Sequence, residues 1–257
     1  IGGGLFLTTP IERFPALKCI QVTSAGLDRV PLDYCKAHGI IVYNAGGVYS
    51  APMAEFVLGG ILQLYKESKF FAENQAAHRW EKHRGLRELG GKIACIIGTG
   101  SVGSAIARRL RAFDVQTVGV NRSGHPAAEF DQTQPTCRLD DLLSLADLVI
   151  CAMPLTVETA GLFDSVRLAK IKSGAVFVNV ARGKVADQQS LAEALQSGQL
   201  SGAVLDVFEE EPLPRSSPLW DMEQVILTPH NSFVGEHNGE RLFKCIKEHL
   251  YELSKEC

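Results

Sequence analysis

The hydrophobic positions of this 257-residue chain fall into short blocks that alternate with longer polar stretches. From Lys92 onward six such blocks occur, each rich in valine or isoleucine and apolar at consecutive positions rather than at every second one. A continuous apolar block is typical of a strand buried on both faces, as in a parallel sheet between two helix layers. The blocks are Ile93 to Ile97, Val115 to Val120, Leu148 to Ala152, Ala175 to Val180, Ala203 to Val207 and Val225 to Thr228.

The polar stretches between these blocks show the starts and ends of helices. Residues 139–146 form one such stretch, residues 164–171 form a second that ends before Gly174, and Asp187 begins a third that ends at Gly198. Strands and helices that alternate in this way predict a doubly wound α/β domain with a parallel sheet.

The rest of the chain predicts a second α/β unit that is smaller and incomplete. Its pattern has two short strands with a helix between them, a long helix that leads toward the sheet, and an amphipathic helix at the end of the chain. These are residues 17–22, 31–37 and 40–43, a helix from Ser50 past Leu64, and residues 236–253. Residues 72–91 are polar, contain Trp80, and are expected to form an arm or loop.

Composition narrows the classes of protein that fit this pattern. Hydrophobic residues make up 46% and charged residues 21% of the chain, as in an average soluble globular protein. The formal net charge is −3, so no basic field is available to hold nucleic acid or an anionic lipid surface. No apolar run approaches the roughly 18 residues that a membrane-spanning helix needs. We therefore expect neither nucleic acid nor a membrane as a partner.

The cysteines and the first residues bear on the cellular compartment. Seven cysteines are scattered along the chain without a Cys-x-x-Cys pair, so we expect reduced thiols and no metal site. The chain has no secretory signal, which favours a cytoplasmic location. It begins with Ile1 rather than methionine, and we expect it to start within a domain.

A glycine-rich segment follows the first block of the predicted sheet. Its residues are Gly98, Thr99, Gly100, Ser101, Val102 and Gly103, and apolar residues at helical spacing come next. Between a strand and a helix at the start of a βα array, this pattern is the dinucleotide-binding fingerprint of a Rossmann domain. The glycines allow a tight turn and a close approach of the pyrophosphate, which lies at the N-terminal end of the helix.

The residues after the second block bear on the choice between NAD and NADP. An NAD-binding domain usually has an acid there, about 20 residues onward, to hold the ribose 2′-hydroxyl. Asn121 stands eighteen positions after Gly103 and is followed by Arg122 and Ser123. An amide, a guanidinium and a hydroxyl can bind a 2′-phosphate that a carboxylate would repel. We therefore expect NADP to be preferred over NAD; the alternative is that Arg122 is a solvated surface charge.

Polar residues follow the last three blocks, where the strands of a parallel sheet end at a common edge and ligands bind. They are Arg182, the acidic residues Asp206, Glu209, Glu210 and Glu211, and His230. An arginine can grip a carboxylate in two places, and a histidine can move a proton near neutral pH. A carboxylate beside the histidine would fix its tautomer and favour the imidazolium. Together these groups suit the reduction of a 2-oxo acid, although spacing does not choose among the three glutamates. Five other histidines are expected at the surface: His38, His78, His83, His237 and His249.

Four segments together resemble the D-isomer-specific 2-hydroxyacid dehydrogenases, the superfamily that includes phosphoglycerate dehydrogenase, glyoxylate/hydroxypyruvate reductase and formate dehydrogenase. The segments are residues 98–103, 179–183, 205–214 and 228–230. The resemblance implies that Arg182 orients the substrate carboxylate and carbonyl, that His230 is the general acid/base, and that Glu211 hydrogen-bonds His230. It also implies cofactor contacts: Asp206 with the nicotinamide carboxamide, Val180 and Ala181 along the nicotinamide, and Pro154 and Thr159 on the adenosine side.

The resemblance further implies how the chain is divided. Residues 1–48 are expected to be part of a flavodoxin-like substrate-binding domain whose first portion is missing, with Ala25 and Gly26 in the loop that holds the substrate carboxylate. Residues 49–232 are expected to form the dinucleotide-binding domain, with an arm at about 72–91 that dimerises. Residues 233–257 are expected to return to the substrate domain as a helix. The family implies a homodimer.

The sequence thus predicts an NAD(P)-dependent 2-oxoacid reductase that uses NADPH and forms a D-2-hydroxy acid. One alternative is a dinucleotide-sensing interaction protein of the corepressor type, because corepressors of this superfamily share the fold. A second alternative is an enzyme that oxidises formate.

Overall fold

The computed structural model describes residues 1 and 4–256 of the chain. The chain divides into two compact units, one made of Ile1–Ala51 with Val234–Cys257 and the other of Pro52–Phe233. Within the described residues, no helix is both long and apolar enough to cross a membrane.

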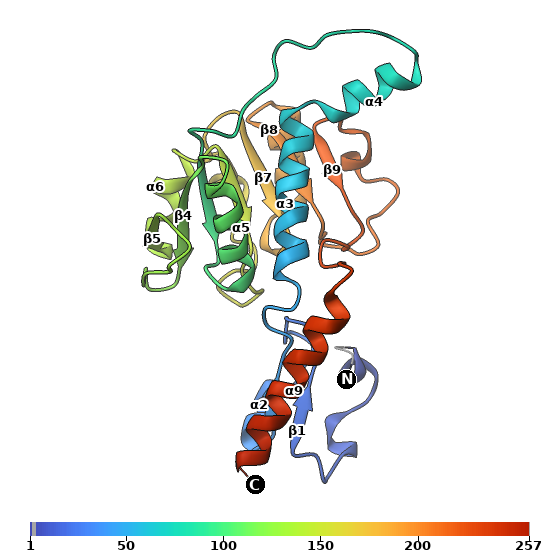
Figure 1. Ribbon diagram of the computed structural model, residues 1–257, viewed down its shortest axis with the longest axis vertical. Helices are drawn as coiled ribbons and strands as arrows, with labels where there is room; N and C mark the ends of the chain where they lie inside the picture. The colour runs from blue at the N-terminus through green and yellow to red at the C-terminus, as the bar shows by residue number, and fades with distance from the viewer. Residues whose placement is uncertain (2–3, 257) are drawn as a thin grey trace. The chain divides into compact units, whose positions relative to one another are not determined.

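In the described part of the larger unit, seven strands form one parallel sheet in the order β5-β4-β3-β6-β7-β8-β9 (Figure 1). The strands are β3 (Ile93–Ile97), β4 (Gln116–Asn121), β5 (Gln132–Pro135), β6 (Leu148–Cys151), β7 (Ala175–Asn179), β8 (Leu200–Leu205) and β9 (Val225–Leu227). The predicted doubly wound α/β fold is confirmed. The six-block pattern missed β5, because this edge strand is made of the polar sequence Gln-Thr-Gln-Pro and has no apolar block.

The strand order reverses direction between β3 and β6. The chain runs outward from β3 through β4 to β5, then crosses back so that β6 pairs with β3 on its other side. In open parallel sheets, ligands bind outside the carboxyl ends of the strands at such a reversal point. The residues that follow β3, β4 and β6 therefore lie where such a sheet binds its ligand.

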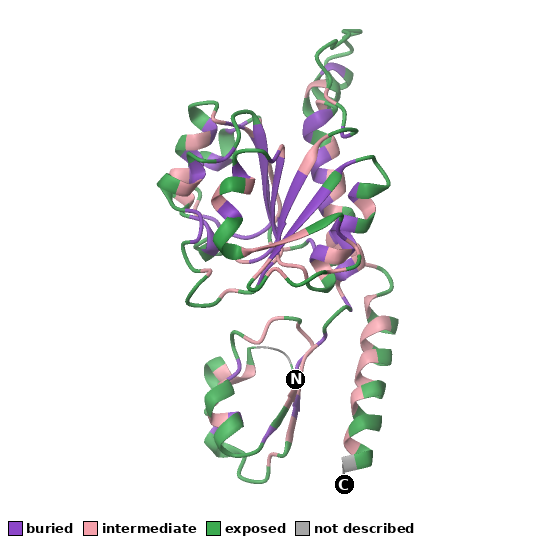
Figure 2. Ribbon diagram, turned by 90° about the vertical axis from the view of Figure 1, so that its left-hand side faces the viewer, coloured by how far each residue is buried: buried purple, intermediate pink, exposed green. Residues whose placement is uncertain are grey.

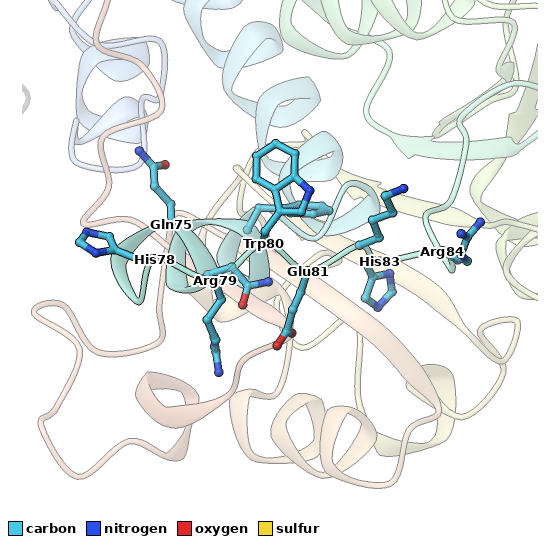
Figure 3. Close-up of a pocket in the computed structure, with 10 residues that line it drawn as sticks. Gln75, His78, Arg79, Trp80, Glu81, His83 and Arg84 are labelled. Atoms are coloured by element: carbon cyan, nitrogen blue, oxygen red, sulfur yellow. The ribbon is translucent and has the colours of Figure 1, made fainter.

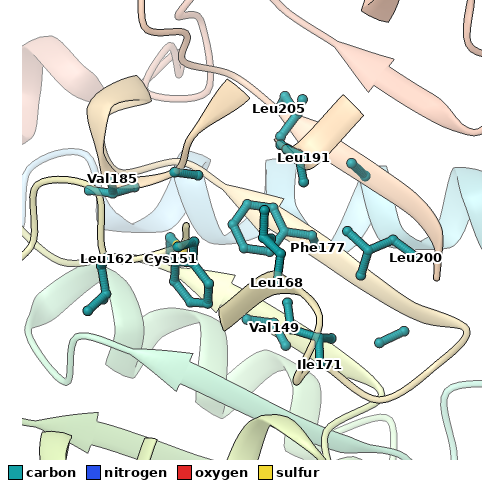
Figure 4. Close-up of a cluster of buried hydrophobic side chains, with 14 of the residues drawn as sticks. Val149, Cys151, Leu162, Leu168, Ile171, Phe177, Val185, Leu191, Leu200 and Leu205 are labelled. Atoms are coloured by element: carbon teal, nitrogen blue, oxygen red, sulfur yellow. The ribbon is translucent and has the colours of Figure 1, made fainter. Parts of the chain in front are cut away.

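Alternate residues of β3 belong to two different apolar clusters. Cys95 and Ile97 join the cluster beneath α6 (Leu139–Leu143), α7 (Ser165–Leu168) and α8 (Gln188–Gln196), which is drawn in Figure 4. Ala94 and Ile96 join the cluster beneath α3 (Ser50–Tyr65) and α5 (Ser101–Arg111). Strands β3, β4, β6, β7 and β8 are buried along most of their length, as the purple ribbons of the sheet in Figure 2 show. Helices on both faces explain why the strand blocks are continuously apolar.

Single residues determine where α7 and α8 begin and how closely α3 packs on the sheet. The side chains of Asp164 and Asp187 accept hydrogen bonds from backbone N–H groups three residues onward and cap α7 and α8. On the other face, a Cβ atom at Gly60 would lie 2.6 Å from the side chain of Val204, so a glycine lets α3 lie directly on β8.

The predicted arm is partly helical. Helix α4 (Ser68–Ala76) continues into the range 72–91 that the sequence assigned to an arm or loop, so the loop prediction is wrong for residues 72–76. Residues 77–92 form turns and extended chain. Lys69 of α4 donates to the carbonyl oxygens of Glu223 and Val225 at 3.0 and 2.7 Å, which ties this helix to the edge strand β9.

The described part of the smaller unit has a pair of parallel strands, β1 (Cys19–Gln21) and β2 (Ile41–Tyr43). Its helices are α1 (Leu5–Thr8), α2 (Leu32–Ala37) and α9 (Asn238–Glu256), with a 3-10 turn at Ile11–Arg13. His249 of α9 stacks on Tyr43 at 4.3 Å, and its Nδ1 lies 2.6 Å from Oε1 of Gln21. The prediction that His249 is a surface residue is wrong, because the ring joins α9 to both strands.

Candidate active site

The glycine-rich loop connects β3 to α5, and its three glycines have different surroundings. Gly98 has φ +107°, and a Cβ there would lie 2.6 Å from the carbonyl oxygen of Ala152. A Cβ at Gly103 would lie 1.9 Å from the carbonyl oxygen of Gly98. A Cβ at Gly100, directly before the helix, would meet nothing within 4 Å. Gly98 and Gly103 thus allow the turn itself, while Gly100 leaves open space at the helix N-terminus, where an anion is favoured.

The loop after β4 is folded around the side chain of Asn121. The Asn121 amide donates to Oγ1 of Thr99 at 3.1 Å and to the carbonyl oxygen of His125 at 2.9 Å, and its oxygen accepts from the N–H of Gly124 at 2.7 Å. Asn121 therefore holds the loop in shape and fixes it to the glycine-rich loop. Arg122 and Ser123 are exposed, and Oγ of Ser123 lies 3.0 Å from Nδ1 of His125. The cationic and hydroxyl groups of this loop remain at its surface.

The loop after β6 lies against the loop after β4. Oγ1 of Thr159 donates to the carbonyl oxygen of Pro154 at 2.8 Å and accepts from the N–H of Thr156 at 2.8 Å, which closes a compact turn. Glu158 in this turn forms an ion pair with Arg122, with 3.4 Å between Oε1 and Nη2. The sequence reasoning missed Glu158, because nothing in the order of residues shows that these two loops meet.

The turn after β7 is shaped by Asn179. Its side-chain oxygen accepts from the N–H of Ala181, and its amide donates to the carbonyl oxygen of Arg182, both at 3.0 Å. Val180 and Ala181 are buried at the end of the strand, and Arg182 is half-buried, with Nη1 donating to the carbonyl oxygen of Ala181 at 2.8 Å. The guanidinium is therefore held close to the strand end instead of extending freely into solvent.

His230 and Glu211 form a hydrogen-bonded pair after β9 and β8. Nδ1 of His230 lies 2.9 Å from Oε2 of Glu211, and each side chain is 36% exposed. The other oxygen of Glu211 accepts from the N–H of Phe208 at 3.1 Å. Glu209 instead accepts from the N–H of Gln188. Of the glutamates that spacing left open, Glu211 is therefore the one that contacts the histidine.

The histidine has an unusual backbone conformation that Asp206 holds. His230 has φ +52°, and its N–H donates to the carbonyl oxygen of Asp206 at 2.8 Å. The Asp206 carboxylate is fully buried and accepts from Oγ1 of Thr228 at 2.6 Å and from the N–H groups of Asn231 and Ser232 at 2.7 and 2.9 Å. A left-handed conformation at a residue other than glycine persists only where its surroundings enforce it. Here the enforcing group is a buried carboxylate.

The sheet brings the residues predicted from the strand ends to one edge. Arg182, Glu211 and His230 follow β7, β8 and β9, which are neighbours in the sheet. Ala25 and Gly26 belong to the smaller unit, in the loop after β1, where their carbonyl oxygens accept from Asn44 at 2.8 Å and Ser24 at 2.9 Å. Among the residues that the structure describes, no group of three His, Cys, Asp or Glu side chains could hold a metal ion.

Known proteins share this chain's sequence and fold. The sequence profile of the D-isomer specific 2-hydroxyacid dehydrogenase, NAD binding domain, matches residues 58–232. A glyoxylate/hydroxypyruvate reductase B of Salmonella gallinarum is 34% identical over 247 residues, which are 94% of this chain and 76% of the relative. A D-isomer specific 2-hydroxyacid dehydrogenase family protein of Aeromonas salmonicida is 34% identical, with a TM-score of 0.83 over 95% of this chain and 78% of that one.

A second similar solved structure contains a bound cofactor. It is an NADPH-dependent glyoxylate/hydroxypyruvate reductase of Sinorhizobium meliloti, solved with NADP and sulfate. It is 27% identical, with a TM-score of 0.81 over 95% of this chain and 78% of that chain.

Proposed function

Because the chain belongs to the D-isomer specific 2-hydroxyacid dehydrogenase family, whose members are NAD(P)-dependent, we propose that it reduces a small 2-oxo acid with NADPH to give a D-2-hydroxy acid. The observation that carries this proposal is the His230–Glu211 pair, 2.9 Å apart, at the sheet edge that also bears Arg182. The glycine-rich loop fits a dinucleotide, since a Cβ at Gly100 would meet open space at the start of α5.

In the proposed mechanism, a bound nicotinamide supplies the hydride. Arg182 binds the substrate carboxylate and orients the carbonyl group. His230 faces Glu211 with Nδ1, so Nδ1 carries a proton and Nε2 is the nitrogen left to hold a second one. Nε2 gives that proton to the carbonyl oxygen as it becomes an alkoxide, and takes it back in the reverse direction. Glu211 keeps the ring oriented and stabilises its positive charge.

The remaining site assignments belong to the same proposal. The backbone N–H groups of Ala25 and Gly26 are assigned to the substrate carboxylate. Asp206 would contact the nicotinamide carboxamide, Val180 and Ala181 would line the nicotinamide, and Pro154 and Thr159 would lie on the adenosine side. Glyoxylate and hydroxypyruvate are the first substrates to test, because the similar proteins of Salmonella gallinarum and Sinorhizobium meliloti are named for them.

The preference for NADPH is supported by the loop after β4. Asn121 replaces the acid that holds a ribose 2′-hydroxyl in NAD-dependent domains, and Arg122 and Ser123 lie exposed beside it. The Sinorhizobium meliloti protein, described as NADPH-dependent, points the same way.

A panel of reductase assays tests the function. The purified full chain is given glyoxylate, hydroxypyruvate, pyruvate and branched or aromatic 2-oxo acids, each with NADPH and NADH. We expect turnover with a small 2-oxo acid and a higher kcat/KM with NADPH. Dinucleotide binding without any turnover would instead favour a sensing protein, and reduction of NAD by formate would favour formate oxidation. A higher kcat/KM with NADH would overturn the cofactor preference.

We also propose that the chain forms a homodimer through its arm. Trp80 is 94% exposed and borders an open hollow of ≈ 880 Å³ lined by α4 and the extended chain after it (Figure 3). A second copy that covers the arm would shield Trp80 from water. Light scattering of the wild-type protein should give twice the mass of one chain. The Trp80→Ala variant should give a mass below that of the dimer.

Finally, we propose a cytoplasmic location. The six cysteines within the described residues are free thiols, the state that a reducing compartment maintains. Cell fractionation tests this assignment, and recovery of the protein from an oxidising compartment would contradict it.

A further inference from the structure

We propose that Glu158 competes with the 2′-phosphate of the dinucleotide for Arg122 and thereby limits how strongly the enzyme prefers NADPH over NADH. The inference rests on the proposed function and concerns a residue outside the dinucleotide fingerprint. It starts from the ion pair between Arg122 and Glu158, which lie in the loops after β4 and β6 and meet although they are far apart in the sequence.

A hydrogen bond from Thr156, in the same turn, orients the Glu158 carboxylate. Oγ1 of Thr156 donates to Oε2 of Glu158 at 2.7 Å, while Oε1 is the oxygen 3.4 Å from Nη2 of Arg122. The hydrogen bond from Thr156 is the largest cause that holds the pKa of Glu158 below its ordinary value, so the carboxylate stays charged at neutral pH. One oxygen is thus held by the turn, and the other is presented to the guanidinium.

Glu158 places a carboxylate beside the loop after β4, and β4 itself ends without an acidic residue. In NAD-dependent domains an acidic residue near the end of that strand accepts a hydrogen bond from the ribose 2′-hydroxyl. Here the strand ends in Asn121, whose amide is used to fold its own loop. Glu158 brings a carboxylate to the same loop from the loop after β6, through its contact with Arg122.

The two cofactors make opposite demands on this carboxylate. A 2′-phosphate carries nearly two negative charges at pH 7 and binds arginine, so it must displace the Glu158 carboxylate from Arg122. The bound phosphate then remains near the negative charge of Glu158, which repels it. A 2′-hydroxyl places no such demand and can donate to a carboxylate. The Glu158 and Arg122 side chains are 66% and 87% exposed, so solvent screens the pair. We therefore expect an effect on the order of twofold to fivefold on binding.

The test measures the Kd of NADPH and of NADH by direct titration of the full chain, without any need for turnover. Glu158→Gln keeps the shape and removes the charge, and should tighten NADPH binding by about twofold to fivefold while NADH binding is unchanged or weaker. Glu193→Gln is the matched control, because Glu193 is an exposed residue on α8 and its loss changes the net charge equally. This control should leave both Kd values unchanged.

A double variant separates competition for Arg122 from simple repulsion. In an Arg122→Met background, Glu158→Gln should have little effect on NADPH binding, because the group for which the two anions compete is gone. The inference would be overturned if wild type and Glu158→Gln had the same ratio of the Kd for NADH to the Kd for NADPH. It would also be overturned if Glu158→Gln tightened NADPH binding as much in the Arg122→Met background as in wild type. Tighter binding of NADH than NADPH by the wild type would overturn the proposed cofactor preference instead, and the ratio between variants would still decide the role of Glu158.

Discussion

The N–H of His230 donates to the carbonyl oxygen of Asp206 at 2.8 Å, and the buried carboxylate of that aspartate accepts from the two N–H groups that follow the histidine. One residue at the end of β8 therefore fixes the backbone at His230 and at the two residues that follow it. The histidine is kept at φ +52°, a conformation that few residues other than glycine adopt. The orientation of its imidazole toward Glu211 depends on this loop.

Asp206→Asn should impair both stability and catalysis. An amide NH₂ in place of one oxygen would face an N–H group or the Thr228 hydroxyl in a buried site, and the unpaired donors should cost about 1–3 kcal/mol of unfolding free energy. A displaced imidazole should lower kcat on the order of 10²-fold. Urea unfolding and steady-state kinetics measure the two effects.

Asp187→Ala is the matched control for this variant. Asp187 caps α8 through the N–H of Ser190, so its loss should cost about 1 kcal/mol of stability. The cap bond is made to Ser190, while α8 meets the turn that carries Glu211 through the hydrogen bond from Gln188 to Glu209, so turnover should fall less than in Asp206→Asn. If Asp206→Asn lowers kcat no more than Asp187→Ala does, Asp206 does not position His230.

His230→Ala should remove the proton donor and leave the dinucleotide site intact. General acid/base catalysis by a positioned side chain contributes about 10²–10⁴-fold, so kcat should fall by that factor while the Kd of NADPH stays the same. Glu211→Gln should cause a smaller loss, because the glutamine oxygen can still accept from Nδ1 but brings no charge. Survival of near-normal turnover in His230→Ala would show that another group moves the proton.

The sequence predicted the parts of this fold that periodicity and strand ends determine, and it missed those that depend on tertiary contacts. Val149 and Phe177 lie in continuous apolar blocks, which directly indicate buried parallel strands. Strand β5 is polar because it lies at the sheet edge, so its pairing with β4 left no apolar pattern to detect. Similarly, α4 has weak periodicity and depends on contacts such as that between Lys69 and β9.

The candidate site shows the same division. A strand–glycine-loop–helix order indicates the dinucleotide site, and Arg182 and His230 stand directly at strand ends where sequence reasoning looks for ligands. Spacing could not separate Glu211 from Glu209, since the choice depends on how the chain turns after β8. Nor could it show that the Asn121 amide is used inside its own loop, which depends on hydrogen bonds to Thr99 and His125.

Two glycine substitutions should separate the folding of the phosphate loop from its binding. Gly103→Ala places a Cβ 1.9 Å from the carbonyl oxygen of Gly98, a backbone atom that cannot rotate away, so thermal stability and NADPH binding should both fall. Gly100→Ala meets nothing within 4 Å in the protein, so the melting temperature should be unchanged. The added methyl group should still obstruct the pyrophosphate and weaken binding by about tenfold, equivalent to roughly one hydrogen bond.

Differential scanning calorimetry and NADPH titration distinguish these outcomes. A Gly100→Ala protein that binds NADPH as tightly as wild type would place the pyrophosphate elsewhere. A Gly103→Ala protein with wild-type stability would show that α5 can move away from the carbonyl group of Gly98 without loss of stability. The close packing of Gly103 on Gly98 would then not be needed for the fold.

Acid should weaken the tie between α6 and α7. Asp140 accepts hydrogen bonds from Nζ of Lys170 at 2.6 Å and Nε of Arg167 at 2.8 Å, and these bonds, that from Lys170 first, hold the pKa of Asp140 below its ordinary value of 3.8. A carboxyl whose pKa is lower in the folded state stabilises the fold above its unfolded pKa. This contribution is lost as the pH falls from about 4 through the folded value.

Asp140→Asn should therefore destabilise the fold by about 1 kcal/mol or less at pH 7, since the side chains of the pair are partly exposed. As the pH falls below about 4 the difference from wild type should shrink, because the unfolded chain then takes up a proton that the folded carboxyl resists. Asp141→Asn is the neighbouring control: its pair with Arg138 is more exposed, so its effect at pH 7 should be smaller. Urea unfolding at pH 7 and pH 3 measures the differences. An Asp140→Asn effect of equal size at pH 7 and pH 3 would mean that the carboxylate charge does not stabilise the contact between α6 and α7.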